Sequence, residues 1–178
     1  MNIERALQIE GWMDEHDLIW LAEKASRYST ICEIGSWQGR STRALADNTT
    51  GMIWAIDHWN GSKEHRTHNW EDRDWCYKSF QNNLSDHISS ARVIPQRMHS
   101  LKAANFFSKS SVRFQMVFID ASHDYKSIKA DILAWKPLCT HLLCGHDAGH
   151  PPVMKATEEL LPNVYNENSM WVYEIANL

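Results

Sequence analysis

Short apolar runs alternate along the chain with segments whose apolar residues recur every three or four positions. The runs predict strands at 29–34, 52–56, 92–95, 114–119, 141–144 and 170–175. The periodic segments predict helices at 14–27, 40–47, 77–84, 101–107, 125–135 and 153–161. Apolar strands that alternate with helices form parallel sheets covered on both faces. The pattern therefore predicts one α/β domain over residues 1–178.

The composition is that of an ordinary globular domain. Of the 178 residues, 43% are hydrophobic and 22% are charged, with 18 basic against 22 acidic side chains. No basic surface favours nucleic acid as a partner, and no apolar run has the length of a membrane span. The N-terminal residues lack the charged-then-apolar layout of a signal peptide, so we expect a cytoplasmic protein.

The four cysteines, Cys32, Cys76, Cys139 and Cys144, form no CxxC pair. Two of them, Cys32 and Cys144, lie inside apolar runs. We expect free thiols buried in the core rather than disulfides or a zinc site.

Polar residues follow several of the predicted strands. They are Glu33, Asp57, Asp120 and the pair His146-Asp147. In open α/β sheets the ligand binds beyond the carboxyl ends of the strands, so these side chains are expected at one edge of the sheet.

A glycine-containing turn follows the first predicted strand. Gly35 and Gly39 allow the backbone to turn tightly and to approach a ligand closely. Ser41 and Thr42 begin a helix whose free N-terminal amides suit a carboxylate. The spacing is not the GxGxxG that brings a backbone up to a pyrophosphate. An acid before such a turn, here Glu33, can hold the ammonium group of a cofactor that carries an amino acid.

Asp57 ends the next predicted strand. An acid roughly 20 residues past the glycine turn is placed to accept hydrogen bonds from ribose hydroxyls. The alternative, a solvated loop acid, is disfavoured because a strand directly precedes Asp57.

Five segments in order resemble the class I S-adenosylmethionine-dependent methyltransferases. The resemblance is to a bacterial branch of small O-methyltransferase-like domains, similar to metal-dependent sugar O-methyltransferases. The segments are Glu33-Ile34-Gly35-Ser36-Trp37 with Gly39-Arg40-Ser41-Thr42, then 97–101 with 103–104, then 118–125 with 129–132, then Gly145-His146-Asp147, then 171–173. The third, which begins Phe118-Ile119-Asp120-Ala121-Ser122-His123, is the most specific. The resemblance implies a Rossmann-like sheet of seven strands, mostly parallel, with the last one antiparallel and helices on both faces.

The resemblance also implies roles for single residues in binding S-adenosylmethionine. Those at the methionine end are Glu33, Gly35, Ser36, Trp37, Gly39, Ser41 and Thr42. Those at the adenosine are Asp57 on the ribose, Met98 and Ser100 against the adenine, and His58; Asp120 also borders the cofactor. The chain departs from the family at Cys139-Thr140-His141, where a Gly-Gly turn is usual, and at Ala148, where an aromatic residue is frequent.

His123 and Asp120 are the predicted catalytic residues. Histidine titrates near neutral pH and can take the proton of an acceptor hydroxyl. The related sugar O-methyltransferases place a catalytic histidine at the equivalent spacing. The alternative is that His123 only caps the helix that begins near Tyr125.

A divalent metal on Asp120, His146 and Asp147 is a further hypothesis. Two carboxylates at one site repel each other unless a cation or a shared proton lies between them. Similar O-methyltransferases bind magnesium with acids at these positions. His146 stands where those enzymes offer an acid or amide, and imidazole suits transition metals better than magnesium, so the identity of the metal stays open.

Two segments have two interpretations each. Residues 58–75, with Trp59, Trp70 and Trp75, form either a lid over the acceptor or a packed loop, with contacts in a homodimer as one variant. Residues 11–13 either cross the cofactor or pack on the sheet.

The leading functional hypothesis is O-methylation of a small hydroxylated acceptor such as a sugar or glycan unit. The acceptor class comes from the resemblance alone. N-methylation is disfavoured because Asp120-Ala121-Ser122-His123 replaces the Asn/Asp-Pro-Pro-aromatic motif of amino-methylating enzymes. A cofactor-binding module without turnover is the other alternative, and the presence of both Asp120 and His123 speaks against it.

Overall fold

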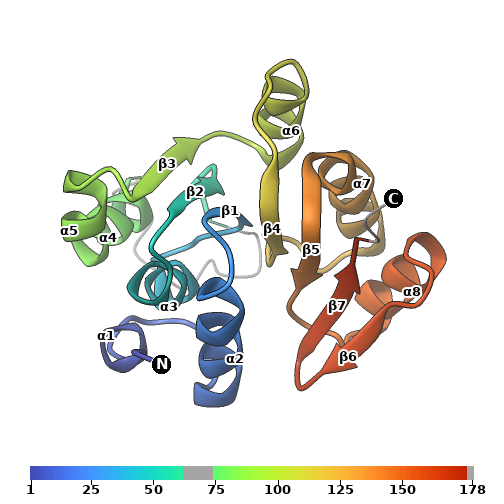
Figure 1. Cartoon of the computed structure of the whole chain (residues 1–178), viewed down its shortest axis with the longest axis horizontal. Helices are drawn as coiled ribbons and strands as arrows, with labels where there is room; N and C mark the ends of the chain where they lie inside the picture. The colour runs from blue at the N-terminus through green and yellow to red at the C-terminus, as the bar shows by residue number, and fades with distance from the viewer. Residues whose placement is uncertain (62–73, 176–178) are drawn as a thin grey trace.

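The computed structural model describes residues 1–61 and 74–175. Within them one sheet has the strand order β3-β2-β1-β4-β5-β7-β6 (Figure 1). The strands are β1 (Thr30–Ile34), β2 (Met52–Asp57), β3 (Val93–Arg97), β4 (Phe114–Ile119), β5 (Cys139–Gly145), β6 (Tyr165–Glu167) and β7 (Met170–Glu174). Neighbours from β3 to β5 pair in parallel, and β7 is antiparallel to both β5 and β6. The predicted seven-stranded sheet with an antiparallel last strand is confirmed.

Helices cover both faces of this sheet (Figure 1). On one side are α1 (Glu4–Leu7), α2 (Glu15–Ala25), α3 (Arg40–Asn48), α4 (Trp75–Asn83) and α5 (Ser85–Ser89). On the other are α6 (Ser100–Ser108), α7 (Tyr125–Trp135) and α8 (Pro151–Leu160). Among the described residues, no helix has the length and apolar character that crossing a bilayer requires.

The central strands are buried on both faces, as expected for parallel strands between two helical layers. In β1, Ile31 packs with the α1–α5 layer, whereas Cys32 and Ile34 pack with the α6–α8 layer. All four cysteines are free and buried, which confirms the prediction of core thiols.

The strand β5 begins earlier than the sequence predicted. A single 3₁₀ turn, Lys136–Leu138, leads directly into β5 at Cys139. Cys139, Thr140 and His141, where the resemblance implied a Gly-Gly turn, are therefore the first residues of β5. Ala148 is buried and packs in the core of the α6–α8 layer.

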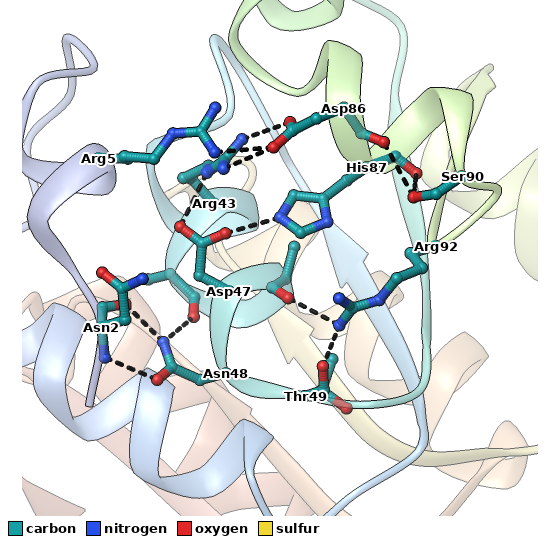
Figure 2. A network of polar contacts seen from close by, with 12 residues as sticks. Asn2, Arg5, Arg43, Asp47, Asn48, Thr49, Asp86, His87, Ser90 and Arg92 are labelled. Atoms are coloured by element: carbon teal, nitrogen blue, oxygen red, sulfur yellow. Dashed lines mark hydrogen bonds and ion pairs between the residues drawn. The ribbon is translucent and has the colours of Figure 1, made fainter.

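A polar network that is buried at Arg43 and Asp47 holds the helix α3 on the side away from the sheet's carboxyl edge (Figure 2). The guanidinium of Arg43 donates to Asp47 at 2.9 Å and to both carboxylate oxygens of Asp86 at 2.7 and 2.9 Å. Asp47 also contacts the Nε2 atom of His87 at 2.7 Å. From the surface, Arg5 reaches the same Asp86 at 2.7 Å. Helix α3 is thereby tied to α5 and α1.

Candidate active site

A cavity of about 1000 Å³ lies at the carboxyl ends of β1, β2, β4 and β5. Twelve of the residues predicted to form the site line it: Gly35, Ser36, Trp37, Ser41, Asp57, His58, Met98, Ser100, Asp120, His123, His146 and Asp147. Glu33, Gly39 and Thr42 are not among its lining residues. The structure therefore brings together most of the predicted site at one edge of the sheet. Glu33, Gly39 and Thr42 lie behind the wall of the cavity.

Gly35 joins the ends of three strands. Its φ of +89° lies in the left-handed region, and a Cβ atom there would lie 2.1 Å from the carbonyl oxygen of Asp120. Its amide donates to Ile56 at 2.8 Å, and the amide of Asp120 donates to Ile34 at 2.8 Å. Only glycine fits this position. The turn after β1 is thus held directly against the end of β4.

Glu33 lies beneath that turn rather than on the cavity wall. It is completely buried, and its Oε2 atom accepts hydrogen bonds from Ser36 Oγ at 2.6 Å and from Thr42 Oγ1. Burial raises the pKa of Glu33 to about 7, although hydrogen bonds from hydroxyl groups oppose the rise. Gly39 precedes α3 with a φ of +92° and likewise belongs to the turn. In this structure Glu33 and Thr42 support the turn from inside.

Asp57 connects the same turn to the end of β2. Its Oδ2 atom accepts hydrogen bonds from the amides of Ser36 at 3.1 Å and Trp37 at 3.0 Å, and its Oδ1 atom accepts one from Trp59 at 2.6 Å. A carboxylate offers about four acceptor positions. Asp57 therefore orders the turn and keeps capacity for one further donor from the cavity.

The residues predicted to lie at the adenine are anchored by a buried acid. Ser100 Oγ donates to Asp131 at 2.5 Å and accepts from Trp135 Nε1 at 2.8 Å. Burial raises the pKa of Asp131 to about 6. Asp131 lines the cavity beside Met98 and was not singled out from the sequence, although it lies in the most specific matching segment. The ring of His58 lies 4.7 Å from that of His99.

The segment before α2 borders the cavity through Glu10, Gly11, Trp12 and Met13. Arg40, which the sequence did not mark, holds this segment by donating to the carbonyl groups of residues 7, 9 and 13 at 3.2, 2.7 and 2.9 Å. Residues 11–13 border the cavity, and Met13 also packs in the core of the α1–α5 layer, so both interpretations of this segment stay open.

The aromatic residues of 58–75 differ in their surroundings. Trp59 is 1% exposed, its ring packs on Tyr77 and Phe80, and its indole donates to the Trp37 carbonyl at 2.7 Å. Trp59 is therefore a core residue and not part of a lid. Trp75 begins α4 and its ring meets Trp37 at 5.4 Å. Trp70 and the rest of the segment 62–73 lie outside the described residues.

Two histidines and two aspartates form a cluster on the cavity wall. The Asp147 Oδ2 atom lies 2.9 Å from Nε2 of His123 and 3.4 Å from Nδ1 of His146. Asp120 lies 3.8 and 3.9 Å from the same two nitrogens. Asp147 has a φ of +61°, a left-handed conformation that aspartate tolerates better than most residues. These four residues are called the His-Asp cluster below.

The charged residues of the His-Asp cluster shift one another's pKa values. Asp120 and Asp147 raise the pKa of His123 to about 10. Burial alone would lower the pKa of His146, but Asp147, Asp120 and Asp17 raise it to about 9. The two histidines hold the pKa of Asp147 well below its usual range. With these pKa values, His123 and His146 are both protonated near neutral pH, and their positive charges face the carboxylates of Asp120 and Asp147.

The helix-cap alternative for His123 does not hold. The N-cap of α7 is Asp124, whose side chain accepts hydrogen bonds from the amides of Lys126 and Ser127 at 3.1 Å each. The side chain of His123 contacts Asp147 instead. His123 is therefore available for chemistry in the cavity.

The donor set of the hypothesised metal site fits a divalent ion. One ligand atom each from Asp120, His146 and Asp147 lie within 4.8 Å of one another. Two carboxylate oxygens and one imidazole nitrogen suit a transition metal such as Mn²⁺, Fe²⁺ or Co²⁺ better than Mg²⁺, which prefers oxygen ligands only.

Known proteins share this fold and sequence pattern. The family model described as "Methyltransferase domain" matches residues 32–148. An O-methyltransferase from Bacillus cereus, solved with S-adenosylhomocysteine, superposes with a TM-score of 0.71 at 16% identity, covering 98% of this chain and 90% of the other. The O-methyltransferase TomG from Streptomyces achromogenes, solved with S-adenosylmethionine, gives 0.69 at 16% identity, with 98% and 86% covered.

A third solved structure, the TDP-rhamnose 3'-O-methyltransferase CalS11, has a TM-score of 0.65 at 13% identity, with 92% and 82% covered. At these identities the solved structures establish the fold, and the family model establishes the kind of protein. Because that model spans more than half of the sequence, the chain belongs to the methyltransferase-domain family.

Proposed function

We propose that this cavity binds S-adenosylmethionine and that the protein transfers the methyl group to a hydroxyl of a small acceptor, such as a sugar or glycan unit. The observation that carries the proposal is the contact of Gly35 with Asp120. It places the glycine turn and the His-Asp cluster on adjoining parts of one wall. A sulfonium methyl held at the turn then lies next to a group that can accept a proton.

The cofactor follows the turn and the two strands beside it. The methionine end lies at Ser36, Trp37 and Ser41, near the N-terminus of α3, where free amides suit a carboxylate. Asp57 accepts a ribose hydroxyl with its remaining acceptor position. A cavity of about 1000 Å³ is at the upper end for a ligand site and has room for an acceptor as well.

Transfer requires the acceptor oxygen in line with the methyl group and a place for the hydroxyl proton. The bond from methyl carbon to sulfur breaks as the bond to the acceptor oxygen forms, and the hydroxyl proton passes to Nδ1 of His123, because Nε2 faces the carboxylate of Asp147 at 2.9 Å and keeps its own proton there. This step needs neutral His123, and the positive sulfonium nearby favours loss of its proton because like charges repel.

The proposal includes a divalent ion that Asp120, His146 and Asp147 would hold. When bound, it supplies positive charge that offsets the two carboxylates and holds the oxygens of the acceptor. The similarity to CalS11, a TDP-rhamnose 3'-O-methyltransferase, supports a sugar as the acceptor class. Asp147 and Asp120 face the Nε2 atom of His123 at 2.9 and 3.8 Å and so orient its ring.

An acceptor screen that measures release of S-adenosylhomocysteine tests this function. We expect release with small hydroxylated acceptors, its loss in EDTA, and its recovery when Mn²⁺ or Co²⁺ is added in excess. Turnover that EDTA leaves unchanged would remove the metal. Tight cofactor binding with no release from any acceptor would instead favour the binding module without turnover.

The variant Asp57→Asn tests the ribose assignment. We expect the Kd for S-adenosylmethionine to rise roughly 10- to 100-fold, because a hydrogen bond to a charged group is worth about 1.5–3 kcal/mol. Isothermal titration calorimetry measures the Kd, and a thermal melt shows whether the turn still folds. Asp74→Asn, at an acid outside the cavity lining, is the control. A wild-type Kd in Asp57→Asn would refute the assignment.

A further inference from the structure

A buried carboxylate that no part of the predicted site included lies behind the His-Asp cluster. Asp17, in the first turn of α2, is 3% exposed, and its Oδ2 atom lies 3.0 Å from Nε2 of His146. The side chain of His146 is itself only 13% exposed. The pair joins α2 to the end of β5, two elements far apart in the sequence (Figure 1).

The local structure of α2 explains how Asp17 reaches His146. The N-cap Asp14 accepts a hydrogen bond from the Asp17 amide at 2.9 Å. At the third helical position an acid often bends back to the cap amide. The carboxylate of Asp17 points instead to His146, and the N-terminus of α2 favours its negative charge.

Burying the carboxylate of Asp17 here costs free energy of folding, and a packing role alone does not explain that cost. The Oδ1 atom of Asp17 is buried with no hydrogen-bond partner among the described residues. A buried, incompletely bonded carboxylate destabilises a fold relative to an apolar side chain of similar size. The other carboxylate oxygen of Asp17, Oδ2, contacts His146, a residue on the wall of the cavity.

We propose that Asp17 is a positioning residue that fixes the imidazole ring of His146. An ionised carboxylate only accepts hydrogen bonds, so the proton of His146 that faces Asp17 stays on Nε2. The other nitrogen, Nδ1, is then the one presented to Asp147 at 3.4 Å and Asp120 at 3.9 Å. This arrangement of a carboxylate behind a histidine is the one that orients histidine ligands at metal sites. The inference rests on the proposed function, because the His-Asp cluster is its reaction site.

Nitrogen-15 NMR of the His146 ring tests the proposal directly. In the wild-type protein we expect an exchange-protected Nε2 proton, assigned by its absence in His146→Gln. The signal persists in Asp17→Asn, whose amide oxygen still accepts, and is lost in Asp17→Leu, which offers no acceptor. A protected Nε2 proton that remains in Asp17→Leu would overturn the proposal.

Titration with Co²⁺ alone provides the second readout. We expect the Kd for Co²⁺ to rise about 10- to 100-fold in Asp17→Leu, as for other carboxylates behind a histidine ligand. Asp14→Ala is the matched control, because it weakens the same helix turn without touching His146. An equal rise in Asp14→Ala would mean that helix stability, not ring orientation, is responsible. If the wild-type protein binds no Co²⁺, the metal of the proposed function fails, while the ring signal still decides the role of Asp17.

Discussion

Replacing His123 with alanine is expected to lower the rate of methyl transfer about 100- to 10,000-fold, the range for loss of a general base. The Nε2 atom of His123 lies 2.9 Å from Asp147 on the cavity wall, whereas Ser36, Trp37 and Asp57, which are assigned to the cofactor, lie at the ends of β1 and β2. Affinity for S-adenosylmethionine should therefore stay near the wild-type value. Single-turnover release of S-adenosylhomocysteine measures the rate, and calorimetry measures the affinity.

The neighbouring His150 provides a matched control for this variant. Its ring lies 6.1 Å from that of His123, but it does not line the cavity, and its side chain makes no capping bond to α8. His150→Ala should retain full activity. If His123→Ala also retained it, positioning alone would explain the transfer, and His123 would serve only to balance the charge of Asp147.

Much of the fold follows from patterns that are local in the sequence. The strand β4 and the helix α7 begin and end where apolar periodicity predicted, because each has a complete buried face and a clear polar boundary. The elements α1, α5 and β6 have three to five residues each, and such lengths are too short to show a period. Without the Gly-Gly turn at residues 139–141, β5 begins at Cys139, directly after a 3₁₀ turn.

The site was predictable where a strand ends and unpredictable where distant elements meet. Asp57, Asp120 and Asp147 follow their strands and reach the cavity, as a parallel sheet requires. Glu33 comes one residue before the end of β1, on the face of Ile31, so strand alternation already directs it toward α3. No sequence pattern indicated the roles of Asp17 and Arg40, because the groups that they contact lie in other segments, which only the folded chain brings near.

The network behind α3 should dominate the stability of the chain. Arg43→Ala is expected to lower the free energy of unfolding by about 3–5 kcal/mol, because it leaves Asp47 and Asp86 without their shared partner. Arg43 itself has 0% of its surface exposed. For a domain of this size the loss corresponds to a fall in Tm of roughly 6–20 °C. Urea unfolding followed by circular dichroism measures it.

Arg5→Ala is the control for Arg43→Ala. It removes the other arginine that binds Asp86, and comparing the two variants shows the effect of burying the arginine. Arg5 and Asp86 have side chains 54% and 45% exposed, so solvent already screens their ion pair. We expect the free energy of unfolding to change by about 0.5 kcal/mol or less. Equal losses of stability in the two variants would contradict the assignment, since both arginines bind Asp86 and only the side chain of Arg43 is buried.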